Sequence, residues 1–249
     1  MDERSLLEQA RAVDPDRSLC ALFAPPRIRA EILGLILLDH ELSRIPLIVT
    51  QPLAGMIRFQ WWRDALASLT QDGPLSVPAL AALAPAVRRG AIALGDLGAL
   101  IDAREHELDE VPPADLAALE IYLASTAGAV SRLMACCLGA GAQDLSAAAG
   151  IGTAWGLVRI ARAFTDEAQG RDVRTEATAL LDRAEVLLST ARQQVGRPSR
   201  DQLAPFLLAR IAKMQSAAFR RCLGDARGIP PLPSMTAAAL LWGWATRRV

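Results

Sequence analysis

The chain has 249 residues, 52% of them hydrophobic, and its 27 basic and 27 acidic residues give a formal net charge of zero. The balanced charge argues against a large nucleic-acid-binding surface, and the length suits a single domain over residues 1–249. Because the charged start lacks the apolar segment of a secretory signal and no apolar run approaches the roughly 18 residues of a membrane span, we expect a cytoplasmic protein or one peripheral on the inner membrane.

Proline and glycine separate a series of helical patterns, and no alternating pattern typical of a strand interrupts them. A short N-terminal helix and one or two turns over Asp16–Phe23 come first. Pro46 is expected to end the following helix, Arg27–Ile45, because proline lacks the backbone donor that a helix interior needs. The sequence therefore predicts an all-α protein. The remaining expected helices are Leu53–Leu69, Pro78–Val87, Ala91–Leu108, Asp115–Leu138, Asp144–Ala168, Thr175–Val195, Arg200–Cys222 and Ser234–Arg247.

Two adjacent tryptophans lie in the segment Gln60-Trp-Trp-Arg-Asp64. Neighbouring residues on a helix point in different directions. We therefore expect one of Trp61 and Trp62 to pack in the core and the other to line a cavity or an interface. The apolar stripe expected on this helix consists of Met56, Phe59, Trp62 and Leu66.

Residue types that act as nucleophiles, general bases or metal ligands are few. His40 and His106 are the two histidines, and neither has a serine or cysteine at a spacing that suggests a triad. The four cysteines show no metal-ligand spacing, which favours buried, reduced thiols; they are Cys20, Cys136, Cys137 and Cys222.

Carboxylates form two groups. Asp102, Glu105 and Asp109 share one helix face because they are three and four residues apart, and the simplest interpretation is a solvated face. Asp166 and Glu167 are adjacent near the end of an apolar helix. They point in different directions, so they do not form a chelating face.

The order of several segments resembles the squalene/phytoene synthase family, and the likeness runs over most of the chain. It is greatest to a divergent branch that carries Gln-Trp-Trp-Arg-Asp and includes a mitochondrial assembly factor of respiratory complex I. The resemblance implies an isoprenoid-synthase-type helical bundle around a central cavity. The segments that carry it are Arg17–Pro25, Ile36–Arg44, Pro52–Leu66, Leu100–Leu108 and Gly152–Arg171.

Active members of this family join two prenyl diphosphates head to head, with Mg²⁺ held by Asp-x-x-x-Asp motifs on two facing helices. In this chain Ser43 and Leu47 occupy the positions of the first motif. The second motif retains a carboxylate at Glu167 but has Ala163 in place of its first aspartate. Both paired-aspartate motifs are therefore incomplete.

The resemblance also assigns roles to single residues. Arg162 matches the arginine that ordinarily precedes the second motif, and Glu107 takes the place of another cavity aspartate. We expect no catalytic and no metal-binding residues, and no cofactor. The substrate-binding candidates are Glu41, Trp62, Glu107, Arg162, Glu167 and Arg171.

The favoured hypothesis is a non-catalytic protein that binds a prenyl group or another lipid, or that helps to assemble a respiratory complex at a membrane surface through contacts with its subunits. The alternative is a prenyltransferase with a reduced Mg²⁺ site. In that case Arg162 and Arg171 would bind diphosphate, and the metal would be held by Glu41, Glu107, Asp166 and Glu167. A third reading is a structural helical module without a ligand.

The C-terminal helix has two open interpretations. Leu240, Leu241, Trp242 and Trp244 precede two arginines, a composition that suits a membrane interface. The same apolar residues also suit packing back onto the bundle.

Overall fold

A computed structural model describes residues 2–70, 75–109, 111–166, 174–223, 240–241 and 244–246, without the side chains of residues 164–166. Every regular element in this part of the chain is helical, which confirms the all-α prediction. The elements are α1 (Glu3–Val13), α2 (Pro15–Ala21), α3 (Pro26–Ile48), α4 (Pro52–Ala67), η1 (Ser68–Thr70), α5 (Pro78–Arg88), α6 (Leu94–Glu105), η2 (His106–Asp109), α7 (Leu116–Leu123), η3 (Ala124–Gly128), α8 (Ala129–Cys137), α9 (Ala142–Asp166), α10 (Arg174–Gln194), η4 (Arg200–Gln202) and α11 (Ala204–Cys222).

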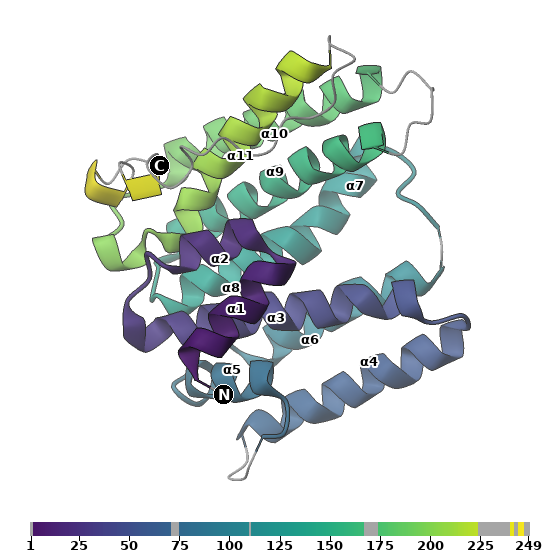
Figure 1. Ribbon diagram of the computed structural model, residues 1–249, viewed down its shortest axis with the longest axis vertical. Helices are drawn as coiled ribbons and strands as arrows, with labels where there is room; N and C mark the ends of the chain where they lie inside the picture. Colours follow the sequence, from purple (N-terminus) through teal and green to yellow (C-terminus); the bar gives the residue numbers. More distant parts are fainter. Residues whose placement is uncertain are drawn as a thin grey trace.

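The helices form two groups that meet along the middle of the molecule (Figure 1). On one side α9 packs lengthwise against α10 and also against α11 and α8. On the other side α3 packs against α5, and α4 packs against α6 at the outer edge. The largest core cluster lies in the second group, and two smaller clusters surround α9.

The middle of α3 runs through the core, because every residue from 31 to 39 is buried. Most of this stretch is apolar on all sides, which is typical of a central helix. On the other side, α9 approaches the turn η3 closely at Gly152. A Cβ at this glycine would lie 2.4 Å from the Ala127 carbonyl oxygen, so the two backbones meet where no side chain fits.

One expected helix end is wrong, and one expected helix contains a turn of another helical type. Pro46 lies inside α3, which continues to Ile48 because Val49 still donates to the Ile45 carbonyl (3.3 Å). Proline near the end of a helix removes one backbone bond without stopping the remaining turn. The single helix expected over Asp115–Leu138 contains the π-helical turn η3 between α7 and α8.

The buried stripe of α4 differs from the predicted stripe at one position. Phe59, Trp62 and Leu66 are buried as expected, whereas Met56 is 51% exposed. Gly55 takes the inward position instead, because a Cβ there would lie 2.5 Å from Cδ2 of Leu108. Close contact between α4 and η2 therefore sets the rotation of α4 and turns Met56 outward.

The described residues of the C-terminal segment pack back onto the bundle. Leu240 is fully buried among apolar side chains of α9 and α11. The Trp244 ring lies 6.3 Å from the ring of Phe23 and under the guanidinium of Arg200. Trp242 and most of the helix expected over Ser234–Arg247 lie outside the described residues. In the part of the chain that the structure describes, no helix has the length and apolarity needed to cross a membrane.

Candidate functional site

A buried carboxylate lies in the apolar middle of α3. Asp39 is 7% exposed and accepts hydrogen bonds from two arginines on different helices. Arg17 on α2 donates to Asp39 Oδ2 (2.9 Å), and Arg104 on α6 donates to Oδ1 (2.7 Å). Each carboxylate oxygen therefore has its own guanidinium, which is the condition under which a buried charge is tolerated.

Arg104 connects this carboxylate to a second one. Its Nη1 donates to Glu107 Oε1 and to the Tyr122 hydroxyl oxygen, both at 2.9 Å. The Tyr122 hydroxyl in turn donates to Glu107 Oε1 (2.9 Å). We call Arg17, Asp39, Arg104, Glu107 and Tyr122 the central network. Its two arginines balance its two carboxylates.

Three members of the central network, Asp39, Arg104 and Tyr122, have shifted pKa values. Burial alone would raise the pKa of Asp39, but the charges of Arg104 and Arg17 outweigh it and lower that pKa to about 2. Burial likewise opposes the charge on Arg104, and Asp39 more than offsets it, so the pKa of Arg104 is raised. Burial and the neighbouring Glu107 raise the pKa of Tyr122 to about 12, against the opposing charge of Arg104. At neutral pH Asp39 and Arg104 therefore stay charged, and Tyr122 stays a hydrogen-bond donor.

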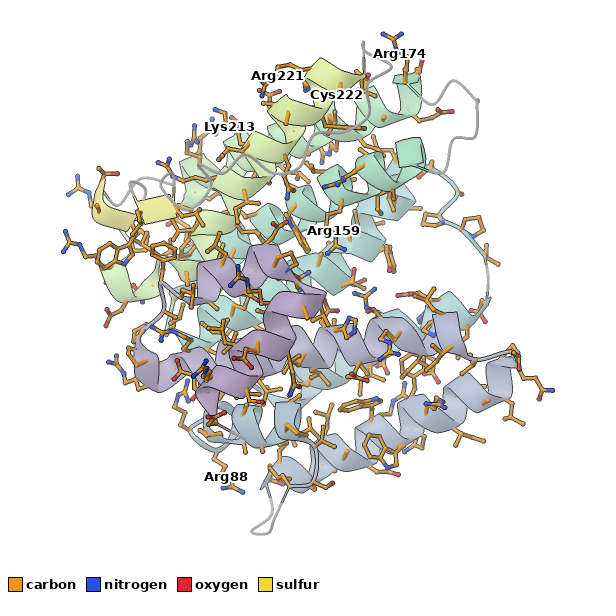
Figure 2. All side chains as sticks on the ribbon, viewed as in Figure 1. Arg88, Arg159, Arg174, Lys213, Arg221 and Cys222 are labelled. Carbon is orange, nitrogen blue, oxygen red and sulfur yellow. The ribbon has the colours of Figure 1, made fainter. Side chains whose placement is uncertain are left out.

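Arg17 also links the central network to Trp155 on α9. The guanidinium carbon of Arg17 lies 4.4 Å from the centre of the Trp155 ring, and that of Arg159 lies 4.7 Å from it. Figure 2 shows Arg159 on α9. The indole nitrogen of Trp155 donates to Asp16 Oδ2 (2.9 Å), so the ring is held by α2 at its polar edge. These contacts fix α2 against α9 by cation–π attraction and by a hydrogen bond.

Asp14, beside Arg17, shows the opposite pKa shift to Asp39. Its side chain accepts from the Arg17 backbone N–H (3.0 Å). Burial raises the pKa of Asp14 by more than Arg17 and Arg159 lower it. The cost of burying this charge is therefore only partly offset, whereas at Asp39 it is fully offset.

A pocket of about 1100 Å³ opens beside Glu107, where α6 ends and α10 begins. Glu107 and Tyr122 of the central network form part of its wall. Most of the remaining lining is apolar, and it includes Leu116, Leu119, Ile160, Ala163 and Leu180. An apolar pocket with a few polar groups is the usual form of a small-molecule site.

A second cavity, of about 780 Å³, lies between α3 and α4, and we call it the α3–α4 groove. Glu41 and both tryptophans of the aromatic segment line it. Trp62 is buried and Trp61 is 51% exposed, which confirms that the two face differently. Their rings meet edge to face at 5.1 Å.

The candidate substrate-binding residues therefore divide between separate places. Glu107 lines the pocket between α7, α9 and α10, whereas Glu41 and Trp62 line the α3–α4 groove. Arg162 is exposed near the end of α9. Glu167 and Arg171 lie outside the described residues, as do their contacts. The Asp166 side chain is not described either.

Two carboxylates of α6 form ion pairs with Arg63 on α4. Arg63 donates to Asp102 Oδ1 (2.6 Å) and also to Glu105. Asp102 is 60% exposed, which confirms a solvated position there, whereas the Glu105 side chain is only 28% exposed. Asp109 is exposed, as expected.

Sequence reasoning missed Asp39, Arg17, Arg104 and Tyr122. One signal for Asp39 was available, because a lone carboxylate inside an apolar helix is rarely buried unless it is paired. Its partners carry no local signal, since they lie 22 and 65 residues away in the chain. Among the described residues, no group of three or more His, Cys, Asp or Glu side chains could hold a metal ion.

The fold is that of an isoprenoid-synthase-type helical protein. The model of the squalene/phytoene synthase family matches residues 10–174, and the chain belongs to that family. A solved structure titled as a dehydrosqualene synthase in complex with ligand covers 98% of this chain and 97% of its own, with a TM-score of 0.76 at 14% identity. This likeness confirms the predicted fold class.

The particular relatives are proteins called NADH dehydrogenase (ubiquinone) complex I, assembly factor 6. The Bos taurus protein is 32% identical over 164 residues, which is 65% of this chain and 49% of the relative. The Homo sapiens protein is 30% identical over 160 residues, which is 63% of this chain and 47% of the relative. The chain thus spans about half the length of the curated relatives that it matches.

Proposed function

We propose that this protein is a non-catalytic member of its family that acts as an accessory factor in the assembly of a membrane-bound respiratory complex. We further propose that the pocket beside Glu107 binds a prenyl group or another lipid chain. The first proposal rests on the contacts of Arg104. Its guanidinium donates hydrogen bonds both to Asp39 on α3 and to Glu107 on η2.

The position of Arg104 opposes the chemistry of the active family members. Joining prenyl diphosphates needs Mg²⁺ ions held by carboxylates on facing segments. Asp39 and Glu107 come from two such segments, but Arg104 already bonds and neutralises both. A metal ion would have to displace a buried guanidinium, and breaking a buried ion pair costs about 3–5 kcal/mol. The described residues therefore fit a magnesium cluster poorly.

The pocket supports the lipid-binding part of the proposal. Its largely apolar walls suit a hydrocarbon chain, and the Tyr122 hydroxyl and Glu107 are among the few polar groups in the lining. The names of the relatives support the accessory role, because these proteins are called complex I assembly factors. A protein that keeps an apolar pocket without a metal cluster can bind a lipid without the metal-assisted chemistry of the active family members.

Catalysis is tested with the purified full chain, farnesyl or geranylgeranyl diphosphate and Mg²⁺. We expect no product above the level of a protein-free control. Clear turnover that disappears in Glu167→Ala would contradict the non-catalytic proposal and favour the reduced Mg²⁺ site.

Lipid binding is tested by extracting the purified protein with solvent and identifying the lipid by mass spectrometry. Ala179→Trp should lower the amount of bound lipid, because Ala179 is exposed and lines the pocket. Thr178→Trp is the matched control, because Thr178 is the neighbour of Ala179, is also exposed on α10 and is not part of the lining. Equal lipid content in both variants would contradict a ligand in this pocket.

The accessory role is tested in cells of the source organism. Deletion of the gene should lower the amount of assembled NADH dehydrogenase complex on native gels, and the tagged chain should co-purify with subunits of that complex. Glu167→Ala should restore assembly as well as the unaltered chain does, because the role does not depend on turnover. A folded Glu167→Ala chain that fails to restore assembly would contradict the proposal.

A further inference from the structure

The corner where α3 passes into α4 exposes an unusual number of large apolar side chains. Other exposed large apolar residues among those described are scattered, such as Ile121 on α7 and Val186 on α10. We call the exposed apolar set on residues 47–61 the α3–α4 corner. Its members are at least half exposed: Leu47 (82%), Ile48 (50%), Leu53 (65%), Met56 (51%), Ile57 (63%) and Trp61 (51%).

The α3–α4 corner arises because α4 is apolar on two faces. One face packs inward through Gly55, Phe59 and Trp62. The spacing of the outward residues places Leu53, Ile57 and Trp61 one helical turn apart on another face. Contiguous exposed apolar surface of this kind marks an interaction site, because it gains free energy when a partner covers it.

Within the stretch of chain that forms the α3–α4 corner, the charges have one sign. From residue 42 to residue 62 the only charged residues are Arg44 and Arg58. Arg44 lies 4.0 Å from Glu41 in a half-exposed pair. Arg58 forms no hydrogen bond or ion pair within the part of the chain that the structure describes, although it lines the α3–α4 groove. Its guanidinium is therefore available to an anionic partner.

The shape and composition of the corner favour a lipid surface. Figure 1 shows the turn between α3 and α4 at the outer edge of the molecule, where a flat partner can reach both helices at once. Apolar side chains with arginines alongside match the boundary between acyl chains and anionic headgroups. A half-exposed tryptophan such as Trp61 suits the same depth.

We propose that the α3–α4 corner docks this protein on a membrane that contains anionic lipids. Leu47, Leu53 and Ile57 enter the boundary between headgroups and acyl chains, and Arg58 contacts lipid phosphates. The inference rests on the proposed accessory function, since it specifies which surface meets the membrane. It differs from the expectation for the C-terminal helix, whose described residues Leu240 and Trp244 pack against the bundle.

The test uses the full chain and vesicles of phosphatidylcholine, with or without 30% phosphatidylglycerol as a chosen composition (about one lipid in three, enough to attract basic residues). We expect co-sedimentation with the anionic vesicles that weakens as salt is added. Ile57→Glu and Leu53→Glu should each weaken vesicle binding about tenfold or more, because a charge replaces an inserted apolar side chain. Arg58→Gln should weaken it about fivefold at low salt.

Two control variants make the test specific. Val186→Glu places the same charge at a position that is 51% exposed on the opposite group of helices, so vesicle binding should be unchanged. Leu241→Glu probes the C-terminal segment, where Leu241 is 55% exposed, and it should also leave binding unchanged. Thermal unfolding of each variant shows that the altered chain is folded.

Trp61 gives a second measurement of the same contact. Quencher-labelled lipids should lower tryptophan fluorescence in the unaltered chain more than in Trp61→Phe, because the other described tryptophans are less exposed. Failure of the unaltered chain to bind anionic vesicles would overturn the proposal. So would equal binding by the corner variants, loss of binding in Leu241→Glu, or a dimer that the corner variants separate.

Failure of the docking proposal can be distinguished from failure of the proposed accessory function. Vesicle binding involves neither a prenyl diphosphate nor a respiratory subunit, so its failure would leave co-purification and the deletion phenotype intact. Conversely, a chain that docks on vesicles through the α3–α4 corner but does not affect complex assembly would refute the function and keep the docking surface.

Discussion

The middle and the end of α3 depart from ordinary burial in opposite directions. Asp39, a charged residue, is 7% exposed in the core, whereas Leu47, two turns later, is 82% exposed. The charge inside has specific partners on α2 and α6. The apolar side chains of the α3–α4 corner are instead at least half exposed. The central network thus contributes to the fold, and the α3–α4 corner is where an external partner would bind.

Along the single helix α3, this contrast separates a residue that stabilises the fold from residues that we propose to bind a membrane. Replacing a member of the central network leaves a buried charge uncompensated, which is expensive. Replacing an exposed apolar residue removes little that the folded chain needs. Variants of the two regions should therefore differ in how strongly they change the free energy of unfolding.

The largest expected effect comes from Arg104→Met, which keeps most of the side-chain length but removes the charge between Asp39 and Glu107. We expect the free energy of unfolding, measured in urea, to fall by about 3–5 kcal/mol. Arg63→Met is the matched control, because Arg63 also bonds two carboxylates but is 30% exposed, and Asp102 is 60% exposed. The control should lose at most about 1 kcal/mol.

Equal losses in Arg104→Met and Arg63→Met would show that burial adds nothing to the value of the ion pairs. The buried central network would then stabilise the fold no more than a partly exposed ion pair does. A smaller loss in Arg104→Met combined with Asp39→Asn than in Arg104→Met alone would confirm that the uncompensated carboxylate causes the cost.

The sequence predicts the helices far better than it predicts this network. Proline, glycine and apolar periodicity are local signals, and they place most helices within a few residues of their observed bounds. The partners of Asp39 are set by how α2 and α6 pack on α3, which no local pattern specifies. The rotation of α4 depends in the same way on Gly55 meeting Leu108. That contact explains why the expected inward position of Met56 is wrong, while the division between Trp61 and Trp62 is confirmed.

The second prediction concerns pH. The folded pKa of Asp39 is about 2 against a usual 3.8, so the folded state holds its ionised form more strongly than the unfolded state does. The resulting stability, about 2 kcal/mol, is complete above about pH 4 and is lost as the pH falls towards 2. Urea unfolding at several pH values should show this loss in the unaltered chain and not in Asp39→Asn.

Asp14 changes the pH dependence of stability in the opposite direction, because its raised pKa disfavours the ionised form in the folded state. Its protonation stabilises the folded chain as the pH falls, so the total profile combines both carboxylates. The difference between the unaltered chain and Asp39→Asn isolates the contribution of Asp39. A difference that does not change between pH 4 and pH 2 would contradict the assigned pKa.

The third prediction tests the contact that turns Met56 outward. Gly55→Ala places a Cβ 2.5 Å from Cδ2 of Leu108, so Leu108 must move. We expect a loss of about 1–2 kcal/mol, near the lower end for overpacking because side-chain atoms can give way. Gly98→Ala on α6 meets nothing within 4 Å and should instead stabilise the chain by about 0.5–1 kcal/mol. Stabilisation by both alanines would show that α4 is not held at Gly55.

The smallest effect is expected at the α3–α4 corner itself. Met56→Gln and Ile57→Gln should change the free energy of unfolding by no more than about 0.5 kcal/mol, because both side chains are more than half exposed. Chemical denaturation of each variant without lipid measures this change. A loss of 2 kcal/mol or more would mean that the folded chain covers these side chains, and the corner would then belong to the core. An unchanged free energy of unfolding would show that folding does not require apolar side chains at these positions. A docking surface requires this result.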